Sequence, residues 1–127
     1  MNTTQVTAIS NYIRDNSDTP FEWGKFDCCI FTSEVIRLQT EIDLYQPYVG
    51  KYHSEATAKK ALKSIGTIES QLDKHFDRIN PNLAQRGDIH MLKDGVMAVQ
   101  FSGQRFATTS KGVRPSETES KLCWRIK

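Results

Sequence analysis

The feature that most constrains the fold is a change in hydrophobic period near Asn80-Pro81. Before this point apolar residues recur every three or four positions, which is typical of amphipathic helices. After it they occur in short runs, and Asp94-Gly95 and Ser102-Gly103 supply hairpin turns between two of these runs. Helices followed by antiparallel strands predict an α+β fold, with N-terminal helices packed on a C-terminal antiparallel sheet.

The periodicity also gives approximate element boundaries. Before the change, it predicts helices over about Thr4–Arg14, from an N-cap at Asp27 to about Leu38, from a cap at Ser54 to Gly66, and over Ile68–Phe76. After the change, it predicts strands over Asp88–Leu92, Val96–Phe101, Arg105–Thr109 and Leu122–Ile126. The polar segment Lys111–Ser120 is expected to be a mobile loop.

Length and charge narrow the class of protein. The chain has 127 residues, which favours a single domain over residues 1–127 with its own core. A net charge of +2 and the lack of a dense Lys/Arg stripe argue against nucleic-acid binding. No apolar run is long enough for a membrane span. Residues Met1–Ser10 lack the basic and apolar regions of a signal peptide, so synthesis in a cytoplasm is expected.

The three cysteines do not form a recognisable disulfide or metal framework. Cys28 and Cys29 are adjacent and Cys123 is remote, an odd count that is unsuited to disulfide pairing. The histidines are scattered and lack the spacing of zinc ligands. We therefore expect neither a metal nor a cofactor.

The most informative segment is Trp23–Phe31, in which Cys28 follows the N-cap residue Asp27. A cysteine in the first turn of a helix lies near free backbone N–H groups and the positive end of the helix dipole, which favour a thiolate. Cys28 is thus a candidate nucleophile, although a buried structural thiol is also consistent with this apolar helix. Cys29 is expected to fill the core, and Asp27 to act as a helix cap rather than as an acid.

Several short segments, taken in order, resemble a known family. They are Trp23-Gly24, Asp27-Cys28, Pro47–Tyr52, Arg86-Gly87-Asp88-Ile89 and Cys123-Trp124-Arg125-Ile126. This order is similar to that of small phage-encoded NlpC/P60-like proteins of the DUF6950 type. The stretch around Cys28 resembles the Phe-Asp-Cys-Ser-Gly-Phe signature of NlpC/P60 cysteine hydrolases. The resemblance implies a papain-like fold with Cys28 at the nucleophile position.

The chain departs from the hydrolase pattern at the other catalytic positions. The resemblance puts the catalytic histidine at Val96 and the third polar residue near Ala107, and both residues are apolar. No histidine follows His90 in the sequence. His90 could serve as a displaced base if its side of the sheet met the helix that begins with Cys28. Otherwise it is an ordinary strand histidine, satisfied by hydrogen bonds or by solvent.

Other residues of these segments have two open interpretations. Trp23, Asp27, Tyr48 and Tyr52, or the aromatic residues among them together with Trp124, could line a groove for a glycan or a peptide. The same side chains could instead anchor the core and the loops. Asp88, at a strand entry after glycine, is expected to bind backbone N–H groups in a turn.

The function implied by the resemblance is a structural or binding role in a phage tail, at the tail tip or baseplate, on a degenerate hydrolase fold. The implied partners are other tail or baseplate proteins and peptidoglycan, with the protein in the host cytoplasm during assembly and then in the virion. The alternative is an active cysteine peptidase or amidase that cuts peptidoglycan stem peptides, with Cys28 as nucleophile and His90 as base. Whether the protein is an enzyme stays open at this point.

Overall fold

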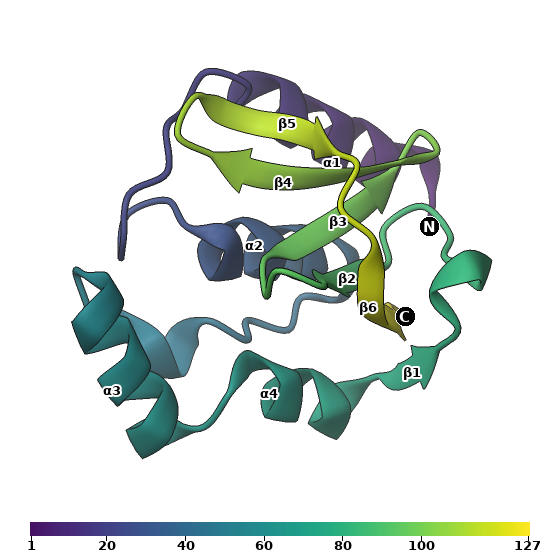
Figure 1. Ribbon diagram of the computed structural model, residues 1–127. Helices are drawn as coiled ribbons and strands as arrows, with labels where there is room; N and C mark the ends of the chain where they lie inside the picture. The colour runs from purple at the N-terminus through teal and green to yellow at the C-terminus, as the bar shows by residue number, and fades with distance from the viewer.

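The computed structural model describes residues 1–127 and has the predicted α+β architecture (Figure 1). The four α-helices precede all six strands, which confirms the predicted order. The helices are α1 (Thr3–Asp15), α2 (Cys28–Thr40), α3 (Glu55–Ile65) and α4 (Ile68–His75), with short 3-10 turns at Gln46–Tyr48 and Pro81–Leu83. None of the helices has the length and apolar character needed to cross a membrane.

The helix boundaries follow from local capping. The Asp27 side chain accepts a hydrogen bond from the Ile30 amide at the start of α2, and the Ser54 hydroxyl accepts one from the Thr57 amide at the start of α3. Each cap satisfies a backbone donor that has no partner inside the helix. Both predicted caps are confirmed, and Gly66 is the C-cap of α3 as expected.

All the strands belong to one antiparallel sheet, in the order β1-β6-β2-β3-β4-β5. Four of them match the predicted strands to within two residues. The strands are β1 (Asp77–Ile79), β2 (Ile89–Leu92), β3 (Met97–Phe101), β4 (Gln104–Thr109), β5 (Gly112–Ser116) and β6 (Ser120–Arg125). The short edge strand β1 is not signalled by hydrophobic alternation, because it contributes only three residues.

The prediction of a mobile loop over Lys111–Ser120 was wrong, because β5 occupies its first half. β5 pairs with β4 along its whole length and forms an edge of the sheet. The Val113 amide also donates to the Asn16 carbonyl, so the chain after α1 covers this edge. At Gly112 a Cβ would lie 2.0 Å from the Ser17 carbonyl oxygen, and φ is +128°. Edge strands are often polar, so the hydrophobic pattern of the sequence does not indicate β5.

The two faces of the sheet carry different side chains. α2 packs against β3 and β4, and α1 packs against α2, so both helices lie on one side (Figure 1). The main core lies there and contains Phe31, Met97, Val99 and Trp124 among its 18 buried residues. Successive strand residues point to opposite faces. A second, small apolar cluster therefore lies on the other face, where buried Leu92, Ala98 and Ala107 pack with Val96.

Candidate functional site

The start of α2 is held by the carboxylate of Asp27, which is only 1% exposed. One oxygen accepts from the Ile30 amide at 3.0 Å. The other accepts from the Gly24 amide at 3.0 Å and from the Tyr52 hydroxyl at 2.5 Å. The expected capping role of Asp27 is therefore present, and the same carboxylate joins three segments of the chain. These bonds use both oxygens, so Asp27 is a structural group here rather than a free acid.

Gly24 lets two of these segments approach closely. Its φ is +77°, and a Cβ added there would lie 2.4 Å from the Tyr52 carbonyl oxygen. A non-glycine residue would clash with backbone and would adopt a left-handed conformation that is unfavourable for L-residues. The glycine after Trp23 is thus required by the contact with the 52–53 segment.

Cys28 is half-buried at the first position of α2, and Cys29 follows it. The Cys29 thiol donates a hydrogen bond to the Cys28 sulfur, which lowers the pKa of Cys28, and the Met97 backbone amide acts in the same direction. Burial and the Asp27 charge oppose this lowering. The pKa of Cys29 is raised, first because its proton is held by Cys28 and then because it is buried. Cys28 is therefore the more readily ionised thiol of the two.

A small, partly open cavity of about 50 Å³ lies beside this pair of cysteines. The four residues predicted to bind a ligand all contribute to its wall. Its lining comprises Trp23, Asp27, Cys28, Cys29, Tyr48, Tyr52, Ala58, Leu62 and Ile68. The Trp23 and Tyr52 rings meet edge to face at 6.5 Å, and the Tyr48 hydroxyl donates to the Gly66 carbonyl at 2.6 Å. These residues thus both anchor loops and enclose a space, so the two interpretations of them are compatible.

Cys28 and Trp23 also line a second, open groove. The groove is bordered by the turn after β2 and by the end of β4. Its lining comprises Phe21, Trp23, Cys28, Asp94, Gly95, Val96, Thr108, Thr109 and Ser110. Thr108 is 8% exposed, and its hydroxyl has no hydrogen-bond partner within the protein. Sequence reasoning missed Thr108, because nothing in a strand sequence shows which hydroxyl will lack a partner.

The positions that the resemblance assigns to the catalytic base and its partner lie together in space. Val96 lines the open groove with Cys28 and also packs in the small apolar cluster that contains Ala107. Ala107 itself lies on the sheet face away from α2 and does not line the groove, so of the two positions only Val96 is next to the thiol. The groove beside Cys28 has an apolar wall where a proton acceptor would be needed.

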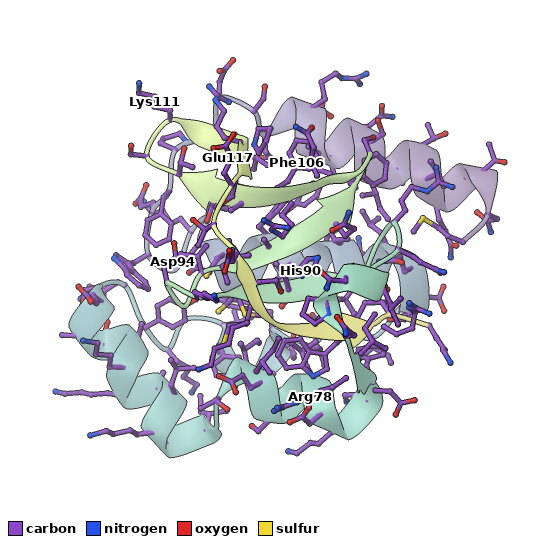
Figure 2. The ribbon with its side chains drawn as sticks, turned by 45° about the vertical axis from the view of Figure 1, so that its right-hand side comes forward. Arg78, His90, Asp94, Phe106, Lys111 and Glu117 are labelled. Atoms are coloured by element: carbon purple, nitrogen blue, oxygen red, sulfur yellow. The ribbon has the colours of Figure 1, made fainter.

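His90 lies elsewhere, in the middle of the sheet. Figure 2 shows it on β2, whereas Asp94, at the border of the groove, lies in the turn after that strand. The neighbouring residue Ile89 faces the main core, so His90 points to the sheet face away from α2. Its Nδ1 lies 2.6 Å from the Ser120 hydroxyl, and its Nε2 lies 2.8 Å from the Gln100 side-chain oxygen. Both ring nitrogens of His90 therefore have hydrogen-bond partners on the sheet. The imidazole lies on the face away from α2 and does not approach the sulfur of Cys28.

The buried imidazole should make stability depend on pH. Burial, as the largest cause, lowers the pKa of His90, although Gln100 opposes this shift. Between the folded and unfolded pKa values the unfolded state binds the extra proton, so stability falls as pH drops below about 6.5. We expect the free energy of unfolding, measured in urea between pH 7 and pH 5, to fall at no more than about 1.4 kcal/mol per pH unit for this proton. His90→Gln should flatten this slope, and equal slopes in both proteins would contradict the assignment.

The remaining histidines and acids do not supply an alternative site. His53 and His75 are exposed, and neither lines the cavity or the groove at Cys28. No three His, Cys, Asp or Glu side chains lie close enough together to hold a metal ion. Cys28 with its two flanking spaces is therefore the strongest candidate site in the molecule.

Comparison with known proteins gives one family assignment. The family model described as "Domain of unknown function (DUF6950)" matches residues 3–126, so the chain belongs to this family. A search of the curated proteins gives no match.

Proposed function

We propose that this member of the DUF6950 family is a non-catalytic binding or structural module on a papain-like NlpC/P60 scaffold, and that it works in a phage tail, at the tip or baseplate. The observation that carries the non-catalytic part is the apolar residue Val96 in the groove that contains Cys28. The scaffold and the tail location rest on the resemblance of the ordered segments from Trp23-Gly24 to Cys123–Ile126. Fold alone does not establish activity, so the argument depends on the site.

The chemistry explains why Val96 weighs against hydrolysis. A thiolate that attacks an amide needs an acid to protonate the leaving nitrogen, and a base to activate water afterwards. General acid–base catalysis contributes about 100- to 10,000-fold to such a reaction. The three histidines of this chain are either engaged in the sheet, as His90 is, or exposed away from the groove. A groove with aromatic walls and no proton relay suits retention of a bound segment rather than its cleavage.

One observation favours the second candidate, an active cysteine peptidase or amidase that acts on peptidoglycan stem peptides. The lowered pKa of Cys28 and its place at the start of α2 provide a nucleophile and backbone N–H donors for an oxyanion. In this candidate Cys28 attacks and His90 would have to reach the groove. The present hydrogen bonds of His90 to Ser120 and Gln100 oppose that movement.

A turnover assay separates the two candidates. The purified protein is incubated with peptidoglycan sacculi, and soluble muropeptides are quantified beside a Cys28→Ala variant. We expect no release that depends on Cys28, because no group protonates the leaving amine. Release by the wild type that disappears in Cys28→Ala would overturn the non-catalytic role. The tail location is tested by mass spectrometry of purified particles, in which we expect a fixed copy number, and absence from the particles would refute it.

A further inference from the structure

The cavity beside the cysteine pair is an apolar space that the side chains of the protein leave unfilled. Asp27 is the only charged residue in its wall, and both of its carboxylate oxygens accept hydrogen bonds from within the protein. The hydroxyls of Tyr52 and Tyr48 donate to Asp27 and to the Gly66 carbonyl. These polar groups are thus engaged internally, and a cavity without free polar partners does not hold water in a stable position.

The size of the cavity restricts what can enter it. Its volume of about 50 Å³ is several times the ~10–15 Å³ that one water molecule needs. It is about a third of the ~150 Å³ of an engineered apolar cavity that binds benzene. The space therefore fits one branched aliphatic group of about three or four carbon atoms, the size of a valine or leucine side chain, and is too small for an aromatic ring.

The cavity is partly open, and an exposed tryptophan contributes to its wall. Trp23 lines both the cavity and the open groove, as Cys28 does, and is 37% exposed. Concave sites lined by apolar and aromatic side chains are the usual binding sites of proteins. An aliphatic group in the cavity would bury further apolar surface of Trp23, while the molecule that carries this group continues into the groove.

Helix α3 forms one wall of the cavity and is the wall most easily displaced. It contributes Ala58 and Leu62 to the lining. It packs mainly on the 3-10 turn Gln46–Tyr48, and Figure 1 shows it at the periphery of the molecule, away from the sheet. An element with few tertiary contacts moves at a lower cost in free energy than a core element such as α2. The cavity can therefore adjust to the shape of the group that enters it.

We propose that this cavity is an anchor pocket for one small aliphatic side chain, of valine or leucine size, on an extended segment of a partner protein. The inference rests on the proposed non-catalytic binding role, and it names the chemistry that this role recognises. The groove, with a volume of about 480 Å³, has room for the main chain of the segment, because it shares Trp23 and Cys28 with the cavity.

A protein segment fits this pocket better than a glycan or a lipid does. A sugar hydroxyl that entered the cavity would lose its hydrogen bonds to water, and the polar groups of Asp27, Tyr48 and Tyr52 are already engaged. A cavity of about 50 Å³ would leave most of an acyl chain in water. A single short aliphatic side chain is buried completely, and its main chain stays in the groove.

Short peptides test the pocket directly. The probes are acetyl-Gly-Gly-X-Gly-Gly-amide peptides in which X is leucine, valine, phenylalanine or glycine, titrated into the native protein and followed by NMR. Trp124 is fully buried in the main core, so the indole N–H signals of Trp23 and Trp124 report the pocket and the core separately. We expect the leucine and valine peptides to shift the Trp23 signal and to bind at least about tenfold more tightly than the other two. No shift with leucine or valine up to about 20 mM peptide would overturn the proposal.

A pair of alanine substitutions on α3 locates the binding. Ala58→Leu fills the cavity and should weaken binding of the leucine peptide at least about tenfold, whereas Ala56, which is exposed and does not line the cavity, provides the control Ala56→Leu. Unchanged binding in a folded Ala58→Leu variant, as checked by circular dichroism, would overturn the assignment. Leu62→Ala enlarges the same cavity and should admit the phenylalanine peptide, and continued exclusion of that peptide would contradict the pocket.

A free small molecule distinguishes a partner segment from a soluble ligand. 2-Methylpropan-1-ol carries the same branched group without a main chain, and we expect it to bind at least about tenfold more weakly than the leucine peptide, because it buries no surface in the groove. Equal or tighter binding of the alcohol would refute a protein segment as the occupant. The non-catalytic role is tested separately by the release of muropeptides, so that either proposal can fail while the other stands.

Discussion

Asp27→Ala should lower the free energy of unfolding by about 3–5 kcal/mol, as measured by urea denaturation. The substitution removes three hydrogen bonds at once, to the Ile30 amide, the Gly24 amide and the Tyr52 hydroxyl. Loss of a helix cap alone costs about 1 kcal/mol. Each buried donor left without an acceptor adds about 1–3 kcal/mol. The effect should be large because the carboxylate is almost fully buried.

A matched control, Asp43→Ala, separates the effect of burial on the free energy of unfolding from the effect of a local hydrogen bond. Asp43 is exposed, and its carboxylate accepts only a local hydrogen bond from the Tyr45 amide at 3.0 Å. Asp43→Ala should therefore cost less than about 1 kcal/mol. Tyr52→Phe should cost about 1–2 kcal/mol, because the carboxylate keeps its two backbone donors. Similar losses in Asp27→Ala and Asp43→Ala would show that Asp27 does not join the three segments.

Asp88→Ala should destabilise the protein by a similar amount, about 3–5 kcal/mol, because it breaks a buried ion pair. The Asp88 side chain is 2% exposed and lies 2.9 Å from the Arg125 Nε, and Arg125 is 25% exposed. The carboxylate also accepts from the Gln85 amide at 2.8 Å and from the Ile126 amide at 3.1 Å. The expected turn contact of Asp88 is thus present, and the same carboxylate also fastens the end of the C-terminal strand.

The exposed pair Lys93–Glu119 is the natural comparison for this prediction. Its side chains are 62% and 73% exposed, so solvent screens their attraction. Glu119→Ala should change the free energy of unfolding by less than about 1 kcal/mol in the same urea titration. If Asp88→Ala were as mild as Glu119→Ala, the tie between the entry of β2 and the end of β6 would contribute little to stability.

The segments that carry the family resemblance meet in two places. Arg86–Ile89 and Cys123–Ile126 are joined through the Asp88–Arg125 pair, about 37 positions apart in the chain. Trp23-Gly24, Asp27-Cys28 and the Pro47–Tyr52 segment are joined by the Asp27 carboxylate and the cavity beside Cys28. One group of segments thus ties the entry of β2 to the end of β6, and the other shapes the candidate site.

Short-range features were sufficient to predict much of this molecule from its sequence. The caps at Asp27 and Ser54, the helix periods and the hairpin turns depend on residues within a few positions of one another. Cys28 could likewise be placed at the start of a helix, because a helix start is a local property. The α+β class followed from the order of these local elements.

Long-range pairing decided the features that the sequence left open. β5 is a strand only because β4 and the chain after α1 lie beside it. His90 is distant from Cys28 because Ile89, not His90, faces the core beside α2. The unpartnered hydroxyl of Thr108 and the contact between Val96 and the Ala107 cluster are equally non-local. The hydrophobic period of a sequence indicates that a residue is buried. The face of the sheet that the residue occupies, and the groups that it contacts, depend on the register and packing of distant strands.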